Sequence, residues 1–411
     1  MPSVICSLRE RSSASLAKTA RGASRSLPPR SRYNTRMEPS SDVLVIGGGI
    51  IGLTTAYFLA EAGRRVEVLD KGEFGREASW AGAGILPPGD PAFAAVPVDR
   101  LRAWGVSRFA AFSGELQART GIDNGYRVCG GIEFLTAEDR YAVELWQQQH
   151  IRCERLTDNR LEPRVRFVPE AEAWHLPDCA QVRNPWHLRA LIAACRSAGV
   201  TLTPHAEFRD WERTSNRVSA VVLTNGERRS AGQFLLASGA WADGGLAALG
   251  IRLGVTPVRG QIVLFRCPEP PLTRVLMHGK RYLVSRADGR VLVGSTEEPE
   301  AGFEKANTAG GIADLTQFAF DLCPALREAE IEQTWAGLRP GSPDGLPFLG
   351  RVPGTENVFC AAGHFRAGVQ LSLGTSRLMK DLLTGTAGEL PAEAFRLDRT
   401  ATPVAPSAFR S

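Results

Sequence analysis

The sequence predicts an α/β fold in which a parallel-sheet domain is interleaved with a second, α+β domain built on an antiparallel sheet. Three observations predict this fold. A strand–helix–strand unit lies near the start of the chain, strand-like segments with a hairpin turn fill its middle, and a glycine-rich segment returns near its end. Since 411 residues are enough for two domains of ordinary size, we expect the late segment to complete the domain that the first unit begins.

The strand–helix–strand unit is apolar and is divided by glycines. Residues 43–46 (VLVI) predict a short buried strand, residues 50–62 a helix that ends at Gly63, and residues 64–70 a second strand. Residues 43–60 carry no charge and are long enough to span a membrane, but the glycines inside them favour a turn between strand and helix. The segment therefore predicts a βαβ unit.

The rest of the chain shows further helical and strand-like patterns. The predicted helices are residues 188–198 and 312–322, and the predicted strands are residues 233–237, 261–266, 281–286 and 290–294. Asp288 and Gly289 predict a hairpin turn between the last two strands. We divide the chain into a leader (1–36), a first domain (37–122, 180–254 and 330–390), a second domain (123–179 and 255–329) and a tail (391–411).

Positive charge is concentrated in the predicted leader. Residues 1–36 carry eight Lys and Arg side chains against one Glu, whereas the whole chain has a formal charge of +5, so the remainder is slightly negative. This distribution argues against a nucleic-acid partner for the body of the protein. A leader rich in Ser and Arg is typical of a transit peptide, but a start wrongly placed upstream of Met37 would produce the same composition. We favour a spurious or disordered leader, and organelle targeting stays open.

The cysteines suggest no metal site. They are scattered, form no CxxC pair and do not cluster with His at ligand spacing. In a chain of this length such cysteines are typical of a reduced, cytoplasmic protein. Beyond residues 43–60 no segment is long and apolar enough to suggest a membrane span, so we expect no membrane partner. The cysteines are Cys6, Cys129, Cys153, Cys179, Cys195, Cys267, Cys323 and Cys360.

The turn of the βαβ unit has the spacing of a dinucleotide-binding fingerprint. Gly47 permits the tight turn, Gly49 lets the backbone approach a pyrophosphate, and Gly52 allows close helix–strand packing. The helix N-terminus adds amide donors, and Asp70 at the end of the next strand accepts hydrogen bonds from ribose hydroxyls. The pattern predicts a Rossmann-type domain and leaves NAD and FAD both open.

Three later segments are more specific than the glycine fingerprint, which indicates only a dinucleotide-binding fold. Residues 77–86 (EASWAGAGIL) are small enough to lay backbone against an extended ligand, residues 335–347 read WAGLRPGSPDGLP, and residues 363–368 read GHFRAG. In these segments the chain resembles the D-amino-acid-oxidase-like family of FAD oxidoreductases, and the likeness runs over about residues 41–383. It is most similar to the members that oxidise glycine and serve thiamine biosynthesis.

The resemblance implies a Rossmann-type FAD-binding domain interleaved with an antiparallel-sheet substrate domain, and FAD held without a covalent bond. Of the implied contacts, those from Ile50 to Ser79 serve the adenosine and pyrophosphate, and those from Ala83 to Ile85 approach the flavin. The implied cofactor-binding residues are Gly47, Gly49, Ile50, Ile51, Gly52, Asp70, Lys71, Ala78, Ser79, Ala83, Gly84, Ile85, Phe208, His364, Phe365, Arg366, Ala367, Gly368, Val369 and Gln370.

For the substrate, the residues that match the family pattern are Arg339, Arg366 and Tyr282. A planar guanidinium holds a carboxylate through two parallel hydrogen bonds, so Arg339 is the first candidate for such a clamp, with a structural ion pair as the alternative. Tyr282 would add a hydroxyl to the same carboxylate. The chain departs from the glycine-oxidising pattern in the two basic residues before Tyr282 and at Glu297, for which we favour a solvated carboxylate at a strand end.

The resemblance implies an oxidative deamination. Hydride passes from the substrate α-carbon to flavin N5, water hydrolyses the imine to an oxo acid and ammonia, and molecular oxygen reoxidises the flavin and becomes hydrogen peroxide. The protein has to position the α-carbon and the neutral amine, so no catalytic residue is assigned, and neither His278 nor His364 is taken as a base.

Alternatives to this function stay open. One is a dehydrogenase for D-amino acids or secondary amines that passes electrons to another acceptor. The other is a flavin domain associated with tRNA modification, against which the slightly negative body argues. A homo-oligomer is the common default for such enzymes.

We expect the leader to be dispensable, because its charge is isolated from the body and Met37 offers a ready start. A variant that begins at Met37 should fold, carry FAD and turn over substrate like the full chain. Thermal unfolding and the visible spectrum of the purified variant check this expectation. Loss of folding on truncation would show instead that residues 1–36 pack against the body.

Overall fold

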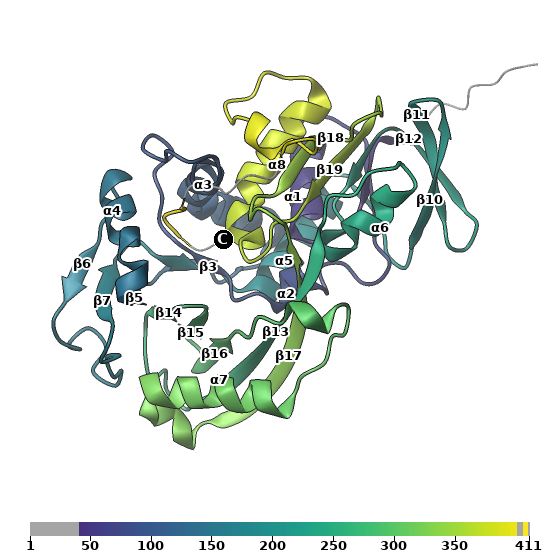
Figure 1. Ribbon diagram of the computed structural model, residues 1–411. Helices are drawn as coiled ribbons and strands as arrows, with labels where there is room; N and C mark the ends of the chain where they lie inside the picture. Colours follow the sequence, from purple (N-terminus) through teal and green to yellow (C-terminus); the bar gives the residue numbers. More distant parts are fainter. Residues whose placement is uncertain (1–40, 401–405, 410–411) are drawn as a thin grey trace, which may run out of the picture. The chain divides into compact units, whose positions relative to one another are not determined.

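The computed structural model describes residues 41–400 and 406–409. The predicted leader, residues 1–36, lies outside the described residues, as do residues 401–405 and 410–411 of the predicted tail. The fold is built on two large sheets, connected through a small third one. Figure 1 shows both large sheets and the helices that accompany them.

The first sheet contains the predicted βαβ unit. Its strands follow the order β10-β11-β12-β1-β2-β9, with β19 beside β12 and β18 beside β19. Strands β9, β2, β1, β12 and β19 pair in parallel, and the near-continuous burial of β1 and β2 fits strands that are covered on both faces. The bounds are β1 (Ser41–Ile46), β2 (Val66–Leu69), β9 (Thr201–Thr203), β10 (Phe208–Thr214), β11 (Arg217–Leu223), β12 (Arg228–Leu236), β18 (Phe348–Arg351) and β19 (Val358–Ala362).

Side chains that alternate along β1 face two different cores. Val43 and Val45 join a cluster with the large helices, whereas Leu44 and Ile46 join a cluster with α6 and the β10–β11 hairpin.

Among the helices of the described ranges, none combines the length and apolar character needed to cross a bilayer. The helices beside this sheet are α1 (Ile50–Glu61), α2 (Ala78–Ala81), α3 (Pro97–Thr120), α5 (Asn184–Ser197), α6 (Ala242–Ala247) and α8 (Gly368–Thr384).

The long helix α3 has clear start and stop signals, and it packs tightly on α8. Pro97 stands at its beginning, Asp99 lies in its first turn, and Gly121 ends it in the left-handed conformation with a φ of 72°. A Cβ atom on Gly374 of α8 would lie 2.2 Å from the carbonyl oxygen of Leu101. The two helices therefore approach more closely than a side chain at this position would allow.

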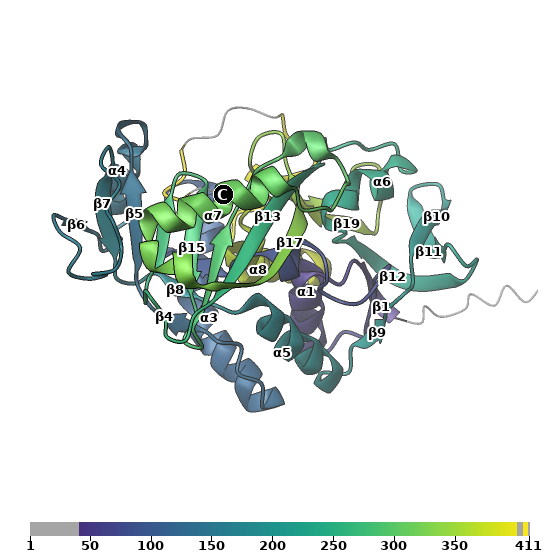
Figure 2. The ribbon, with the colours of Figure 1, turned by 90° about the horizontal axis from the view of Figure 1, so that it is seen from below.

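The second sheet is largely antiparallel, as the hairpin signals predict. Its order is β17-β13-β16-β15-β14-β5-β7-β6, and helix α7 (Ala309–Leu322) lies along one face (Figures 1 and 2). Helix α4 (Tyr141–Gln148) follows β5. The strands are β5 (Gly131–Leu135), β6 (Glu154–Leu156), β7 (Glu172–Leu176), β13 (Thr256–Arg266), β14 (Val275–His278), β15 (Arg281–Ser285), β16 (Arg290–Gly294) and β17 (Glu330–Gly341).

The two sheets meet at α2 and at the small third sheet. A Cβ atom on Gly337 of β17 would lie 2.5 Å from the Cβ of Ala81 on α2, and the Trp335 indole N–H donates to the Ala81 carbonyl over 3.1 Å. The small sheet runs β3-β8-β4 and joins strands that lie far apart along the chain. Its bounds are β3 (Ile85–Leu86), β4 (Arg127–Val128) and β8 (Ala180–Gln181).

The elements expected from the sequence are present, and one pairing differs from the expected division. Strand β17 pairs with β13 in the second sheet, although residues 330–390 are assigned above to the first domain. The glycine-rich composition of β17 suits contact with a ligand, but its long antiparallel pairing with β13 is not visible in a local pattern. The described residues belong to one unit by their internal contacts, so the two-domain division stays a prediction.

The described part of the predicted tail packs against the body of the protein. Phe395 is fully buried, Leu397 and Phe409 are each 8% exposed, and Ala408 is 2% exposed. These apolar residues are too widely spaced to form a helical or strand-like pattern, which is why the sequence shows no element there.

Gly52 illustrates how the βαβ turn depends on a missing side chain. A Cβ atom at this position would lie 1.9 Å from the Gly47 carbonyl oxygen, so Gly52→Ala must shift the backbone of the turn. We expect a loss of about 1–3 kcal/mol in the free energy of unfolding, measured by denaturant titration. Gly114 of α3, whose Cβ would meet nothing within 4 Å, is the matched control. If Gly52→Ala and Gly114→Ala unfold alike, the turn tolerates the change and this account of it is wrong.

Candidate active site

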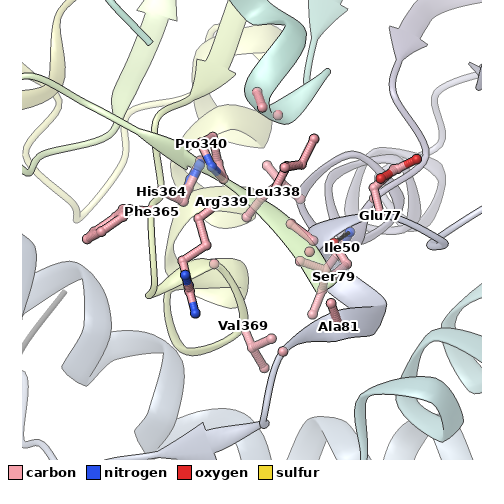
Figure 3. A pocket seen from close by; sticks show the side chains of 18 of the residues that line it. Ile50, Glu77, Ser79, Ala81, Leu338, Arg339, Pro340, His364, Phe365 and Val369 are labelled. Atoms are coloured by element: carbon pink, nitrogen blue, oxygen red, sulfur yellow. Dashed lines mark hydrogen bonds between the residues drawn. The ribbon is translucent and has the colours of Figure 1, made fainter. Parts of the chain in front are cut away.

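A cavity of about 460 Å³ lies where the βαβ turn, α2, the second sheet and the start of α8 come together. It opens at the carboxyl ends of β1, β2 and β12, the edge at which open α/β sheets bind ligands. Its volume falls in the range of cofactor and substrate pockets, roughly 300–1,000 Å³. Figure 3 shows Phe365, Arg339 and Val369 toward one end of this space and Ile50, Ser79 and Glu77 toward the other.

The turn at the nucleotide end has no room for side chains. Gly47 has a φ of +108°, and a Cβ there would lie 2.4 Å from the Ala237 carbonyl oxygen. One carboxylate oxygen of Asp70 accepts from the Gly48 amide (2.7 Å) and the other from the Gly72 amide (2.9 Å). Burial raises the pKa of Asp70 above its ordinary value, against the effect of these amides. Each oxygen keeps a lone pair that fits a ribose hydroxyl.

The N-terminus of α1 faces the cavity and has no capping side chain of its own. The Ile50 amide instead donates to the Ser79 hydroxyl oxygen over 2.9 Å. That hydroxyl keeps its own O–H as a donor, next to the free amides and positive dipole end of the helix. Amide and hydroxyl donors at a helix N-terminus fit the pyrophosphate of a dinucleotide.

The segment from Ala83 to Ile85 is held by an arginine that the sequence analysis missed. Arg286 donates to the Ala83 carbonyl (2.7 Å), to the Gln181 side chain (2.6 Å) and to the Val182 carbonyl (3.2 Å). Burial, together with the neighbouring Arg183 and Arg127, lowers its pKa to about 10. In the sequence Arg286 is one more polar residue before the Asp288–Gly289 turn, so no signal marks it.

The loop before α8 lines the cavity opposite the βαβ turn. Its Phe365 amide donates to the Pro340 carbonyl over 2.9 Å, which ties the loop to β17. His364 is buried against Thr375, and burial lowers its pKa to about 3, so its imidazole is neutral at ordinary pH. Gln370 faces the cavity, and its buried side-chain oxygen has no hydrogen-bond partner among residues 41–400 and 406–409. An unpartnered acceptor here fits a ligand with an N–H group, as a flavin has.

Arg339 projects from β17 into the cavity (Figure 3). Its guanidinium donates to the Ser295 hydroxyl (2.5 Å) and to the Thr296 carbonyl (3.2 Å), and it forms no ion pair with a carboxylate of the described residues. A Cβ on Gly260 would lie 2.2 Å from it, so the guanidinium lies flat over the backbone of β13. The structural ion pair considered above as the alternative for Arg339 is therefore absent from the described part of the chain.

Arg366 belongs to an ion-pair network at the same end of the cavity. It pairs with Glu297 (3.1 Å) and donates to the Lys280 carbonyl (2.5 Å), while the Lys280 ammonium pairs with the other oxygen of Glu297 (2.6 Å). Burial opposes ionisation of Glu297, but Lys280 and Arg366 outweigh it and hold its pKa below the ordinary value. The expectation of a solvated carboxylate at Glu297 is wrong, because the residue bridges two cations across neighbouring loops.

Nearly all the site residues inferred from the sequence line this one cavity. Tyr282 does so with its ring over Gly294, where a Cβ would lie 2.6 Å from the Tyr282 hydroxyl. Gly52 and Ala367 lie behind the lining and shape it through the backbone. The individual roles stay predictions. In the described ranges no group of His, Cys, Asp or Glu side chains is arranged to hold a metal ion.

Comparison with known proteins shows which family this chain resembles. Residues 42–382 match the family described as FAD dependent oxidoreductase. The chain is 38% identical to a glycine oxidase of Pseudomonas aeruginosa over 84% of its own length and 95% of the relative's. It is 35% identical to a bifunctional ThiO/ThiG protein of Synechocystis over 84% of its own length and 52% of the relative's.

A solved structure agrees with the architecture. The crystal structure of glycine oxidase from Geobacillus kaustophilus superposes with a TM-score of 0.82 at 34% identity, covering 88% of this chain and 99% of that one. The α/β fold class and the resemblance carried by residues 335–347 and 363–368 are thereby confirmed. With the family shown over most of its length, the chain belongs to the FAD-dependent oxidoreductases of the D-amino-acid-oxidase family.

Proposed function

We propose that this protein oxidises glycine or another small amino acid to an oxo acid and ammonia, with molecular oxygen as the acceptor and hydrogen peroxide as the second product. The proposal rests on one observation: Arg339 lines the cavity as a cation and has no acidic partner among the described residues. Relatives named glycine oxidase and ThiO/ThiG support the substrate class and a role in thiamine biosynthesis.

FAD bound in the cavity without a covalent bond would supply the hydride acceptor and the route to oxygen. The residues that would hold it follow from their positions. Asp70 takes the ribose, the amides at the start of α1 with Ser79 take the pyrophosphate, and Gln370 offers its oxygen to the flavin. Arg286 holds the Ala83 carbonyl, and with it the segment that would approach the flavin.

Arg339 is the residue we assign to the substrate carboxylate. Its hydrogen bonds to Ser295 and Thr296 leave N–H groups of the guanidinium to donate, and neither of these two acceptors is a carboxylate. A carboxylate in this partly desolvated place gains two parallel charge-assisted hydrogen bonds. Tyr282, which lines the cavity from β15 of the same sheet, is assigned the supporting hydroxyl.

Arg366 has a different part in the proposal. Arg366 pairs with one oxygen of Glu297, and Lys280 pairs with the other. We assign Arg366 to fixing the rim of the cavity beside the flavin.

Arg339→Lys keeps the positive charge and loses the planar fork. We expect kcat/KM for glycine to fall roughly 30- to 1,000-fold, which corresponds to about 2–4 kcal/mol, with FAD content unchanged. Peroxide formation and oxygen uptake measure the rate, and their equality shows that oxygen is the acceptor. Primary amines without a carboxylate should lose little on the same substitution.

Arg290→Lys is the matched control, because Arg290 lies in the same sheet, pairs with Glu332 and stays outside the cavity. It should oxidise glycine like the parent. If Arg339→Lys also does so, or loses activity equally on amines and amino acids, Arg339 is structural and does not hold the substrate.

A further inference from the structure

The family match ends at residue 382, yet a residue far beyond it forms part of the cavity wall. Phe409 lines the cavity and is 8% exposed. In Figure 1 the short yellow segment of residues 406–409 lies between α3 and α4. The cavity of this chain therefore has a component that the family pattern does not supply.

A buried ion pair anchors this segment. Asp99 and Arg102, one turn apart on α3, pair with each other and are each 2% exposed. Asp99 accepts from the Ser407 hydroxyl (2.6 Å) and the Ala408 amide (2.9 Å), and Arg102 donates to the Ser407 hydroxyl (3.1 Å). These contacts give both buried charges hydrogen-bond partners, which lowers the cost of burying them.

The helix α4 adds a second anchor. The Trp146 indole N–H donates to the Ala408 carbonyl over 2.7 Å, and the Trp146 and Phe409 rings stack with centroids 5.8 Å apart. Gln149, the residue directly after α4, donates to Asp99 over 2.8 Å, which links this anchor to the ion pair. Phe409 is thus held from its backbone and from one face of its ring.

The surroundings of Phe409 locate it within the cavity. It belongs to the apolar cluster that contains Ala83, against which Ile85, Met277 and Tyr282 pack. Ile85 belongs to the segment assigned to the flavin, and Tyr282 is assigned to the substrate. The nucleotide end, around Asp70, belongs to other clusters and is formed by other elements.

We propose that Phe409 is a specificity-determining residue: its ring closes the substrate end of the cavity and limits the size of the amino acid that fits beside the flavin. The inference rests on the proposed function and deepens it. Asp99 and Arg102 act as positioning residues, because they hold the backbone of residues 407–409 and do not themselves line the cavity. A fixed aromatic wall discriminates by size, since enlarging a substrate by one methylene against it costs about 10- to 200-fold in kcat/KM.

The variant Phe409→Ala, studied with FAD bound, tests whether the Phe409 ring limits the size of the substrate. Two substrate series start from glycine: sarcosine and N-ethylglycine grow at the nitrogen, and D-alanine and D-leucine grow at the α-carbon. We expect the ratio of kcat/KM for a larger member to that for glycine to rise about 10-fold or more in at least one series. Phe409→Leu, which keeps most of the apolar packing, should give a smaller rise in the same series.

Phe395→Ala is the matched control. Phe395 is also an aromatic residue beyond the family match and is fully buried, but it does not line the cavity. Its removal should lower the melting temperature and leave the substrate ratios unchanged. A similar change of ratios in Phe395→Ala and Phe409→Ala would show a general loosening and overturn the inference.

A binding measurement separates this inference from the proposed function. Acetate, butyrate and benzoate are titrated into the oxidised protein, and Kd is read from the change in the visible flavin spectrum. Phe409→Ala should bind the larger carboxylates more tightly relative to acetate, whether or not any amino acid is turned over. If the parent oxidises none of the amino acids, the proposed function fails, and the Kd ratios alone test whether Phe409 limits the size of the ligand. If glycine is oxidised but Phe409→Ala changes neither the kcat/KM ratios nor the Kd ratios, Phe409 does not limit ligand size and the proposed function still holds.

Discussion

The close approach of backbone to backbone at the first turn is the constraint on which the rest of the structure depends. Without side chains at Gly47 and Gly52, the turn packs under α1 and presents the helix N-terminus to the cavity. Asp70 then ties the turn to the end of β2 through the Gly48 amide. The turn therefore presents backbone amides and one carboxylate to the cavity, and the Ser79 hydroxyl lies beside them.

The second sheet supplies what the first cannot, a cation at the reacting end. Strand β17 presents Arg339 from the sheet while Gly337 of the same strand packs on α2, so one element both joins the sheets and carries the residue assigned to the substrate. The neighbouring cations Arg366 and Lys280 are paired with Glu297. Arg339 has no ion pair among the described residues, so an incoming carboxylate meets it without displacing an acidic partner there.

How well each residue of this site could be predicted from the sequence depends on how far apart along the chain its partners lie. Gly47, Gly49, Gly52 and Asp70 could be inferred because the mechanical reason for each lies within one βαβ unit. Arg339 and Tyr282 needed the resemblance to a family, since their presence in one cavity depends on pairing between strands that lie far apart along the chain. Contacts made by single side chains across the fold gave no local signal: Arg286 on the Ala83 carbonyl, Glu297 between two cations, and Phe409 in the cavity wall.

The central claim is that an amino acid held in this cavity delivers hydride to bound FAD. Anaerobic addition of glycine, followed by sarcosine and small D-amino acids, to the purified protein tests it most directly through the visible flavin spectrum. We predict that at least one of them bleaches the flavin, and that admitting oxygen restores the colour with release of hydrogen peroxide. A protein that binds FAD but stays fully oxidised with every one of these compounds, while the same preparation is bleached by dithionite, would contradict the account.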